Sequence, residues 1–158
     1  MRRVVQLAMT AGLVLFAHNP VPAQSSAAPE AFVRRTYNRY DAKSPASPDF
    51  LGRDAPSVFT PALLRLIHGD EKHTPRGDVG KLDGDPICDC QDPDGLKLTG
   101  VQIVRQQDTA TAKVDLHFPS ESPLRHIRLR LILLPQGWRI DDIATDDTSS
   151  LRRLLQSN

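Results

Sequence analysis

Four runs of alternating apolar and polar residues fill the second half of the chain, from Leu96 onward. This two-residue period is typical of β-strands that bury one face. Short segments rich in turn-forming residues separate the runs, as in antiparallel hairpins. We therefore expect a four-stranded antiparallel meander with one buried face. Its predicted inward residues are Val101 and Ile103, then Ala112, Val114, Leu116 and Phe118, then Ile127, Leu129, Leu131 and Leu133, and finally Trp138 and Ile140.

The same pattern predicts how the strands align. If the apolar faces of the second and third strands coincide, Val114 lies opposite Leu129, and Asp115 then pairs with Arg128 on the polar face. In the fourth strand the alternation slips between Ile140 and Ile143. The slip predicts a β-bulge at Asp141-Asp142, which can turn one carboxylate toward the covered face.

Helices are expected both before and after these strands along the chain. Apolar residues at helical spacing predict one helix over 29–42, with Ser25 and Ser26 as N-cap candidates. Thr60 and Pro61 begin a second helix that Gly69 is expected to end. A capping cluster before Leu151 predicts a short final helix. N-terminal helices packed on a curved four-stranded meander make an α+β domain, which we assign to residues 24–158.

The first 23 residues have the composition of a secretory signal peptide. Arg2 and Arg3 precede an apolar stretch over 4–17, and Val21-Pro22-Ala23 offers small residues for a signal peptidase. The apolar stretch is shorter than the roughly 20 residues that a spanning helix needs. We expect cleavage between Ala23 and Gln24, and a periplasmic or secreted product.

Charge and hydropathy exclude some classes of binding partner for the exported chain. The whole chain has 20 basic and 19 acidic residues, and removing Arg2 and Arg3 with the signal leaves 18 and 19, a formal charge of −1. Without a basic excess, binding to nucleic acid is disfavoured. No second apolar segment is long enough to span a membrane. The expected partner is a small molecule or a periplasmic protein.

Residues 74–95 contain four glycines, three prolines and six aspartates, which argues against regular structure. A loop of this length in a small domain usually has a function or is mobile. Its aspartates do not follow the helix–loop–helix calcium pattern, because Ile87 and Cys88 stand where an oxygen ligand and a glycine are required. Zinc is disfavoured too, since Cys88 and Cys90 are only one residue apart, whatever histidines lie near them. We predict no metal and no cofactor.

The two cysteines leave three outcomes open. In an oxidising compartment, Cys88 and Cys90 can form a strained local disulfide, an intermolecular disulfide, or two buried thiols. The local disulfide is the favoured one. A redox- or metal-responsive protein acting through Cys88 and Cys90 is therefore one alternative function.

A pocket is the other candidate site. We expect Asp85 and Gln91 to converge on the covered side, unless both side chains bind loop backbone groups instead. The full set of expected pocket residues is Asp85, Gln91, Asp92, Tyr37, Tyr40, Trp138 and Asp142. A carboxylate base in such a pocket, Asp85 or Asp142, would suit a small hydrolase or isomerase. No complete catalytic constellation is present in the sequence, so we assign no catalytic residue and favour a non-enzymatic binding module.

Three segments of the chain are similar to a known family. They are Phe32 to Asp41, Leu82-Asp83-Gly84-Asp85-Pro86 running to Gln91-Asp92, and the closing Trp138-Arg139-Ile140-Asp141-Asp142-Ile143. Together they resemble domain-of-unknown-function family 3828, which consists of small exported bacterial proteins. The last segment also resembles the final strand of the nuclear-transport-factor-two-like cone fold. The resemblance implies this fold and export, and it implies no established activity.

Export gives the first prediction. Because the small residues at Val21 and Ala23 fit signal peptidase, the secreted protein should begin at Gln24 when its N-terminus is sequenced. A secreted protein that still carries Met1 would contradict this.

Overall fold

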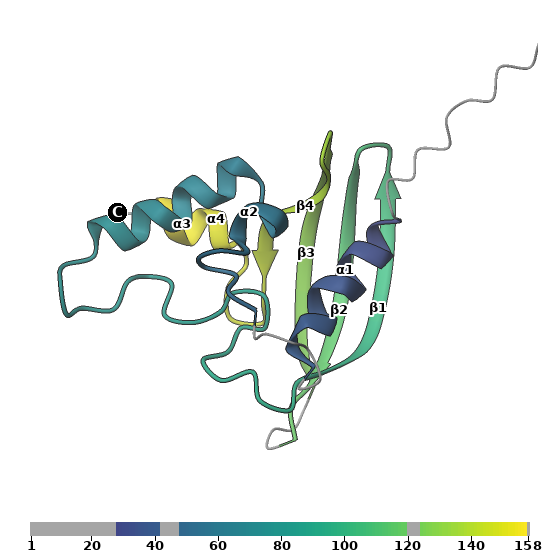
Figure 1. The fold of residues 1–158 in the computed structure, drawn as a ribbon, viewed down its shortest axis with the longest axis horizontal. Helices are drawn as coiled ribbons and strands as arrows, with labels where there is room; N and C mark the ends of the chain where they lie inside the picture. The colour runs from purple at the N-terminus through teal and green to yellow at the C-terminus, as the bar shows by residue number, and fades with distance from the viewer. Residues whose placement is uncertain (1–27, 42–47, 120–123, 158) are drawn as a thin grey trace, which may run out of the picture.

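The four alternating runs form one antiparallel sheet in the order β1-β2-β3-β4 (Figure 1). The strands are β1 (Lys97–Gln106), β2 (Thr109–His117), β3 (Arg125–Leu134) and β4 (Gly137–Ala144). The structure is a computed structural model that describes residues 28–41, 48–119 and 124–157. Helices precede and follow the sheet, so the predicted α+β fold with a four-stranded meander is confirmed.

One face of the sheet forms most of the core. The inward residues of β2, β3 and β4 are buried, including Leu116, Leu129 and Leu131, which have no exposed surface. Arg128 and Arg130 alternate with them and are exposed. The covered face is therefore the one that the alternation predicted.

The pairing of β2 with β3 differs from the prediction by two residues. Val114 lies opposite Ile127 rather than Leu129, and Asp115 lies opposite His126 rather than Arg128. The His126 imidazole Nδ1 is 2.8 Å from Asp115 Oδ1. A shift of two keeps every side chain on its face, so the apolar pattern cannot distinguish the two registers.

The predicted bulge in β4 is confirmed. Arg130 pairs with Asp142 and Leu131 pairs with Ile140, which leaves Asp141 as the extra residue. Asp141 is only 6% exposed. Its Oδ1 accepts hydrogen bonds from the Thr60 hydroxyl at 2.9 Å and from the Arg152 guanidinium at 3.1 Å.

The first helix is shorter than predicted. The α-helix α1 (Pro29–Tyr37) continues as a single 3₁₀ turn, η1 (Asn38–Tyr40). Phe32, Val33 and Tyr37 are its buried apolar residues, and α1 packs across β1 and β2 (Figure 1). Ala28 occupies the N-cap position without a side-chain hydrogen bond, and the predicted caps Ser25 and Ser26 lie outside the described residues.

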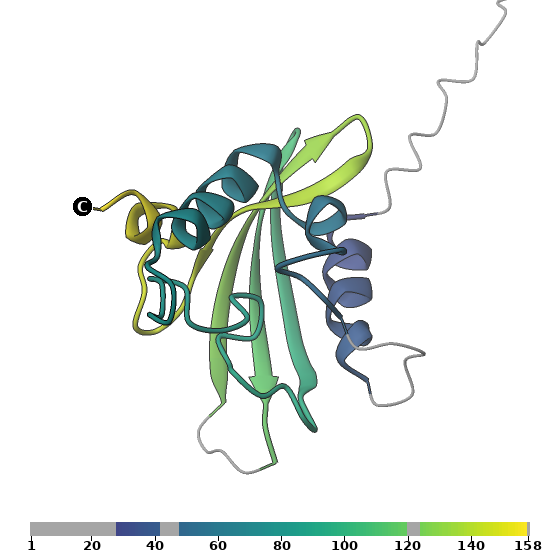
Figure 2. The same cartoon turned by 60° about the vertical axis from the view of Figure 1, so that its left-hand side comes forward.

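The remaining helices gather at the β4 edge (Figure 2). They are α2 (Ala55–Val58), α3 (Pro61–His73) and α4 (Leu151–Gln156). Thr60 caps α3 as predicted, because its hydroxyl accepts from the Leu63 N–H. The predicted stop at Gly69 is wrong: α3 runs on to His73, since a helical glycine only weakens a helix by about 1 kcal/mol.

The segment predicted to be a signal peptide, with its cleavage point between Ala23 and Gln24, lies outside the described residues. Within the described ranges, no helix has both the length and the apolar character needed to cross a membrane.

The core assignment can be tested at Leu131. Because its side chain is fully buried, Leu131→Ala should lower the free energy of unfolding by about 2–5 kcal/mol, measured by chemical denaturation. Val104 is 65% exposed in the same sheet, so Val104→Ala is the matched control and should change stability by about 0.5 kcal/mol or less. Equal losses in the two variants would contradict the assignment.

Candidate functional site

The segment over 74–96 connects the end of α3 to the start of β1, without a helix or strand of its own. Figure 2 shows it crossing in front of the sheet. Two of its residues, Ile87 and Cys88, are completely buried, so the segment is anchored in the core at its middle. The predicted absence of regular structure over 74–95 is confirmed.

Asp85 joins this segment to η1, the 3₁₀ turn that follows the first helix. Its Oδ2 accepts a hydrogen bond of 2.6 Å from the Tyr40 hydroxyl, and its Oδ1 accepts one of 2.9 Å from the Ile87 N–H. Its backbone also pairs with Cys90, which closes a small loop around Pro86 to Asp89. Each oxygen of the Asp85 carboxylate therefore already has a donor from the chain itself.

Tyr37 holds the same loop through a second hydrogen bond. Its hydroxyl donates a 2.7 Å hydrogen bond to the Ile87 carbonyl oxygen, and its ring lies 6.1 Å from the ring of Tyr40. Two buried tyrosines, one turn apart on α1 and η1, thus hold the loop at two neighbouring points. This is a rigid connection, because both hydroxyls are satisfied by fixed acceptors.

Burial governs the titration of this cluster. Burial raises the pKa of Asp85 above its usual value, and the hydrogen bonds from Tyr40 and Ile87 oppose that change only in part. Burial, followed by the nearby Asp85 carboxylate, also raises the pKa of Tyr40. Tyr40 consequently keeps its proton and acts as the donor to Asp85.

Cys88 and Cys90 form the local disulfide, with their Cα atoms 5.1 Å apart. The residue between them, Asp89, has a φ of 52°, in the left-handed region that side-chain-bearing residues seldom adopt. Arg125 at the start of β3 donates hydrogen bonds to the carbonyl oxygens of Cys88 and Asp89. The carbonyl groups of this turn thus have a charged donor.

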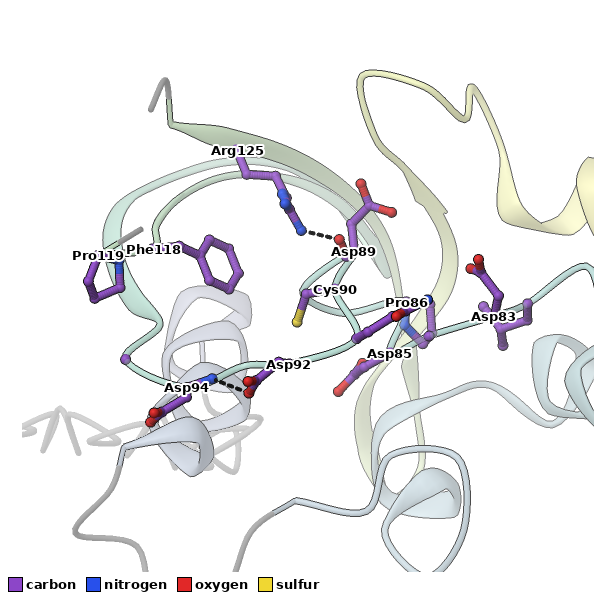
Figure 3. A pocket seen from close by; sticks show the side chains of 14 residues that line it. Asp83, Asp85, Pro86, Asp89, Cys90, Asp92, Asp94, Phe118, Pro119 and Arg125 are labelled. Atoms are coloured by element: carbon purple, nitrogen blue, oxygen red, sulfur yellow. Dashed lines mark hydrogen bonds between the residues drawn. The ribbon is translucent and has the colours of Figure 1, made fainter. Parts of the chain in front are cut away.

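An open groove of about 740 Å³ lies beside this loop (Figure 3). Its walls come from the 82–95 segment on one side, and from Phe118, Pro119 and Arg125 at the ends of β2 and β3 on the other. Aspartates dominate its charge, since one arginine faces five carboxylates. These are Asp83, Asp85, Asp89, Asp92 and Asp94.

The structure brings some of the predicted pocket residues together. Asp85, Gln91 and Asp92 all line the groove, but the Gln91 and Asp92 side chains are exposed to solvent. Tyr37 and Tyr40 lie behind the loop and hold it, without lining the groove. Asp85 and Gln91, which were expected to converge, therefore differ: the Asp85 carboxylate accepts from a loop N–H, and Gln91 is exposed to solvent.

Trp138 and Asp142 lie elsewhere. Trp138 is at the start of β4, opposite Leu133 near the β3–β4 turn, where the Arg105 guanidinium lies 5.2 Å from its ring. Asp142 caps the last helix, accepting from the Ser150 hydroxyl at 2.7 Å and from the Arg152 N–H at 3.0 Å. Neither residue lines the groove.

Sequence reasoning did not select Phe118 or Arg125 for the site. Arg125 lies 4.7 Å from the Phe118 ring, in a cation–π arrangement. These residues are at the ends of consecutive strands, more than 20 positions beyond the aspartates, so nothing local connected them to the loop. Within the part of the chain that the structure describes, no group of three or more histidine, cysteine, aspartate or glutamate side chains is arranged to hold a metal ion.

Comparison with known proteins identifies one similar chain. The sequence is 30% identical over 160 residues to the uncharacterised protein YqhG of Escherichia coli strain K12. The alignment covers 99% of this chain and 50% of YqhG, so the chain spans about half the length of the curated relative it matches. No protein-family model matches the chain, and no solved structure matches it. The protein is thus a distant relative of a protein without an assigned activity.

The raised pKa of Asp85 predicts a pH effect on stability. Because the folded protein binds the Asp85 proton more tightly than the unfolded chain does, this residue contributes most below its usual pKa of 3.8. The contribution is lost as the pH rises through the raised pKa of the folded state. Denaturation of the wild type and of Asp85→Asn from pH 3 to pH 7 should therefore show the stability advantage of the wild type falling as the pH rises. An advantage that grows over this range would contradict the assignment.

Proposed function

We propose that the protein is an exported, non-catalytic binding module, and that its groove takes a positively charged ligand. The proposal rests on one observation: both candidate bases, Asp85 and Asp142, already accept hydrogen bonds from other parts of the fold. Asp85 holds Tyr40 and the Ile87 N–H, and Asp142 caps α4. Neither carboxylate is left available for the proton transfers of a hydrolase or isomerase, which would need one aimed at the substrate.

The groove itself suits binding. Its wall is fixed in advance by the two tyrosine hydrogen bonds and by the contacts of Arg125, so a ligand would order little of the protein. Asp83, Asp92 and Asp94 face solvent around it, while Arg125 is engaged with loop carbonyl oxygens. The local excess of negative charge favours an amine-bearing small molecule or a basic peptide segment.

Export belongs to the same proposal. The basic start, the short apolar stretch and the small residues before Gln24 support a cleaved signal and a periplasmic or secreted protein over residues 24–158. We also propose membership of domain-of-unknown-function family 3828 with its cone-like fold. The three matching sequence segments support this assignment, and so does the order of helices and strands.

A charged peptide probe tests the binding proposal. A pentalysine peptide titrated into the protein at low salt should shift the amide NMR signals of the 82–95 segment and of Phe118 and Arg125. Asp83→Asn should weaken this binding by up to about fivefold, as expected for one exposed charge. Asp108→Asn removes a carboxylate that is also exposed, at the β1–β2 turn outside the groove, and should leave the affinity unchanged.

A second variant separates the groove from general charge attraction. Gln91→Ala alters the groove wall without changing the charge, and Gln102→Ala alters an exposed glutamine in β1 outside the groove. Weaker binding with Gln91→Ala alone supports the groove as the site. Shifts spread over the whole surface, or equal effects of Asp83→Asn and Asp108→Asn, would contradict the proposal.

A further inference from the structure

We propose that the Cys88–Cys90 disulfide is a thiol–disulfide exchange site on the wall of the groove. In this proposal Cys90 Sγ is the atom attacked, and the reductant is a thiol or dithiol without net negative charge. The site would be an exchange centre in its own right, and it does not require that the groove bind any other ligand.

The two cysteines differ in their access to solvent. Cys88 has no exposed surface, whereas Cys90 is partly exposed and lines the groove. In Figure 3 the Cys90 sulfur points into the space between Phe118 and Asp92. A thiolate that enters the groove therefore meets Cys90 first, and Cys88 becomes the leaving group.

The disulfide adds little to the stability of the folded chain. The stabilisation from a cross-link grows with the number of residues it encloses, and this one encloses a single residue. That residue, Asp89, has a φ of 52°, in a region that costs free energy for a residue with a side chain. A cross-link of this kind is a poor structural brace, which favours a chemical role.

The surroundings are suited to the reduced state as well. Cys88 Sγ lies 3.6 Å from the Asp85 carbonyl oxygen and 3.8 Å from the Cys90 carbonyl oxygen. A disulfide sulfur has no proton to donate, but the Cys88 thiol formed by reduction would have one. Two acceptors for that thiol are thus already in place.

The loop would also keep its shape after the bond breaks. The backbone pair between Asp85 and Cys90, the Tyr37 bond to Ile87 and the Arg125 bonds to the turn carbonyls do not involve the sulfurs. Because these bonds keep the cysteines close together, the reduced pair can be reoxidised. The exchange would therefore be reversible.

The reaction balances with a dithiol as the partner. One thiolate of the reductant attacks Cys90 Sγ, the Cys88–Cys90 bond breaks, and its electron pair passes to Cys88 Sγ, which takes up a proton from solvent. The second thiolate of the reductant then attacks its own sulfur in the mixed disulfide and releases Cys90, which is protonated in turn. The reductant leaves as a disulfide, having given two electrons to the protein, and the two thiol protons are returned through solvent.

The charge of the groove sets which thiols react. Asp83, Asp92 and Asp94 line the same groove as Cys90, so an anionic thiol is repelled from the groove and a cationic one is attracted to it. The interaction is between partly solvated charges, and salt should therefore reduce it.

Reduction of the native wild-type protein by three small thiols tests this. The probes are cysteamine, 2-mercaptoethanol and 3-mercaptopropionate, and the measurement is the rate of appearance of alkylatable cysteines by mass spectrometry. Each thiol's rate with the protein is divided by its rate with a small acyclic disulfide, which removes differences in intrinsic reactivity. This normalised rate should be about tenfold higher for cysteamine than for 3-mercaptopropionate at low salt, and the difference should shrink at high salt. Asp83→Asn should reduce the difference in rate among the three thiols, and Asp108→Asn should leave that difference unchanged.

Trapping experiments identify the attacked sulfur. Cys90 in the Cys88→Ser variant should form a mixed disulfide with oxidised cysteamine at least about tenfold faster than Cys88 does in the Cys90→Ser variant, because protection by burial slows exchange. Equal rates would overturn the proposal. The proposal would also be overturned if the wild-type disulfide were reduced only as fast as the protein unfolds. The same holds if the three thiols reduced it at equal normalised rates. Both measurements use the wild-type protein alone. These rates are measured without pentalysine, so a wild-type protein that fails to bind the peptide would leave the exchange proposal standing.

Discussion

The buried carboxylate of Asp141 is the contact on which the arrangement of the helices depends. A lone carboxylate inside a protein is destabilising by several kcal/mol, and Asp141 avoids this by accepting from Thr60 and Arg152. These donors belong to the cap of α3 and to α4, so one side chain fixes both helices to β4. The neighbouring Ile140 strengthens the contact, because its carbonyl oxygen accepts from the Thr60 N–H at 2.8 Å. The bulge is what turns this carboxylate inward, out of the register of the strand.

The position of α3 in turn explains the long loop. Strand β4 is one edge of the sheet and β1 is the other, so the chain that leaves α3 must cross the whole sheet before β1 can begin. A crossing segment without backbone partners in the sheet needs side-chain anchors. Ile87 and Cys88 supply buried apolar surface, and Asp85 supplies the polar contact with Tyr40. The groove is the space left where this segment passes the ends of β2 and β3.

The sequence allowed the strands, their buried faces and the bulge to be predicted, because each depends on a pattern within about ten residues. It did not allow the β2–β3 register to be predicted, since a period of two is unchanged by a shift of two, and a charge pair with Arg128 was an equally good match to the pattern. The site was harder still. Tyr40 and Asp85 are 45 positions apart, and only the packing of α1 against the loop brings them together. Trp138 was expected beside this loop because it lies on the covered face, but its place along β4 puts it near the other end of the sheet.

The aspartates show why residue type alone could not identify the site. Asp141 and Asp142 have donors on neighbouring helices, and Asp85 has one on η1, so these three carboxylates contribute to the fold. Asp83, Asp92 and Asp94 lie on the exposed side of the same loop and remain open to solvent. In the sequence the two groups look alike, because what separates them is whether a donor from another element reaches them. Asp83, Asp92 and Asp94 line one groove together with Cys90 of the disulfide. The local charge there, rather than the near-neutral charge of the whole chain, will determine which molecules approach.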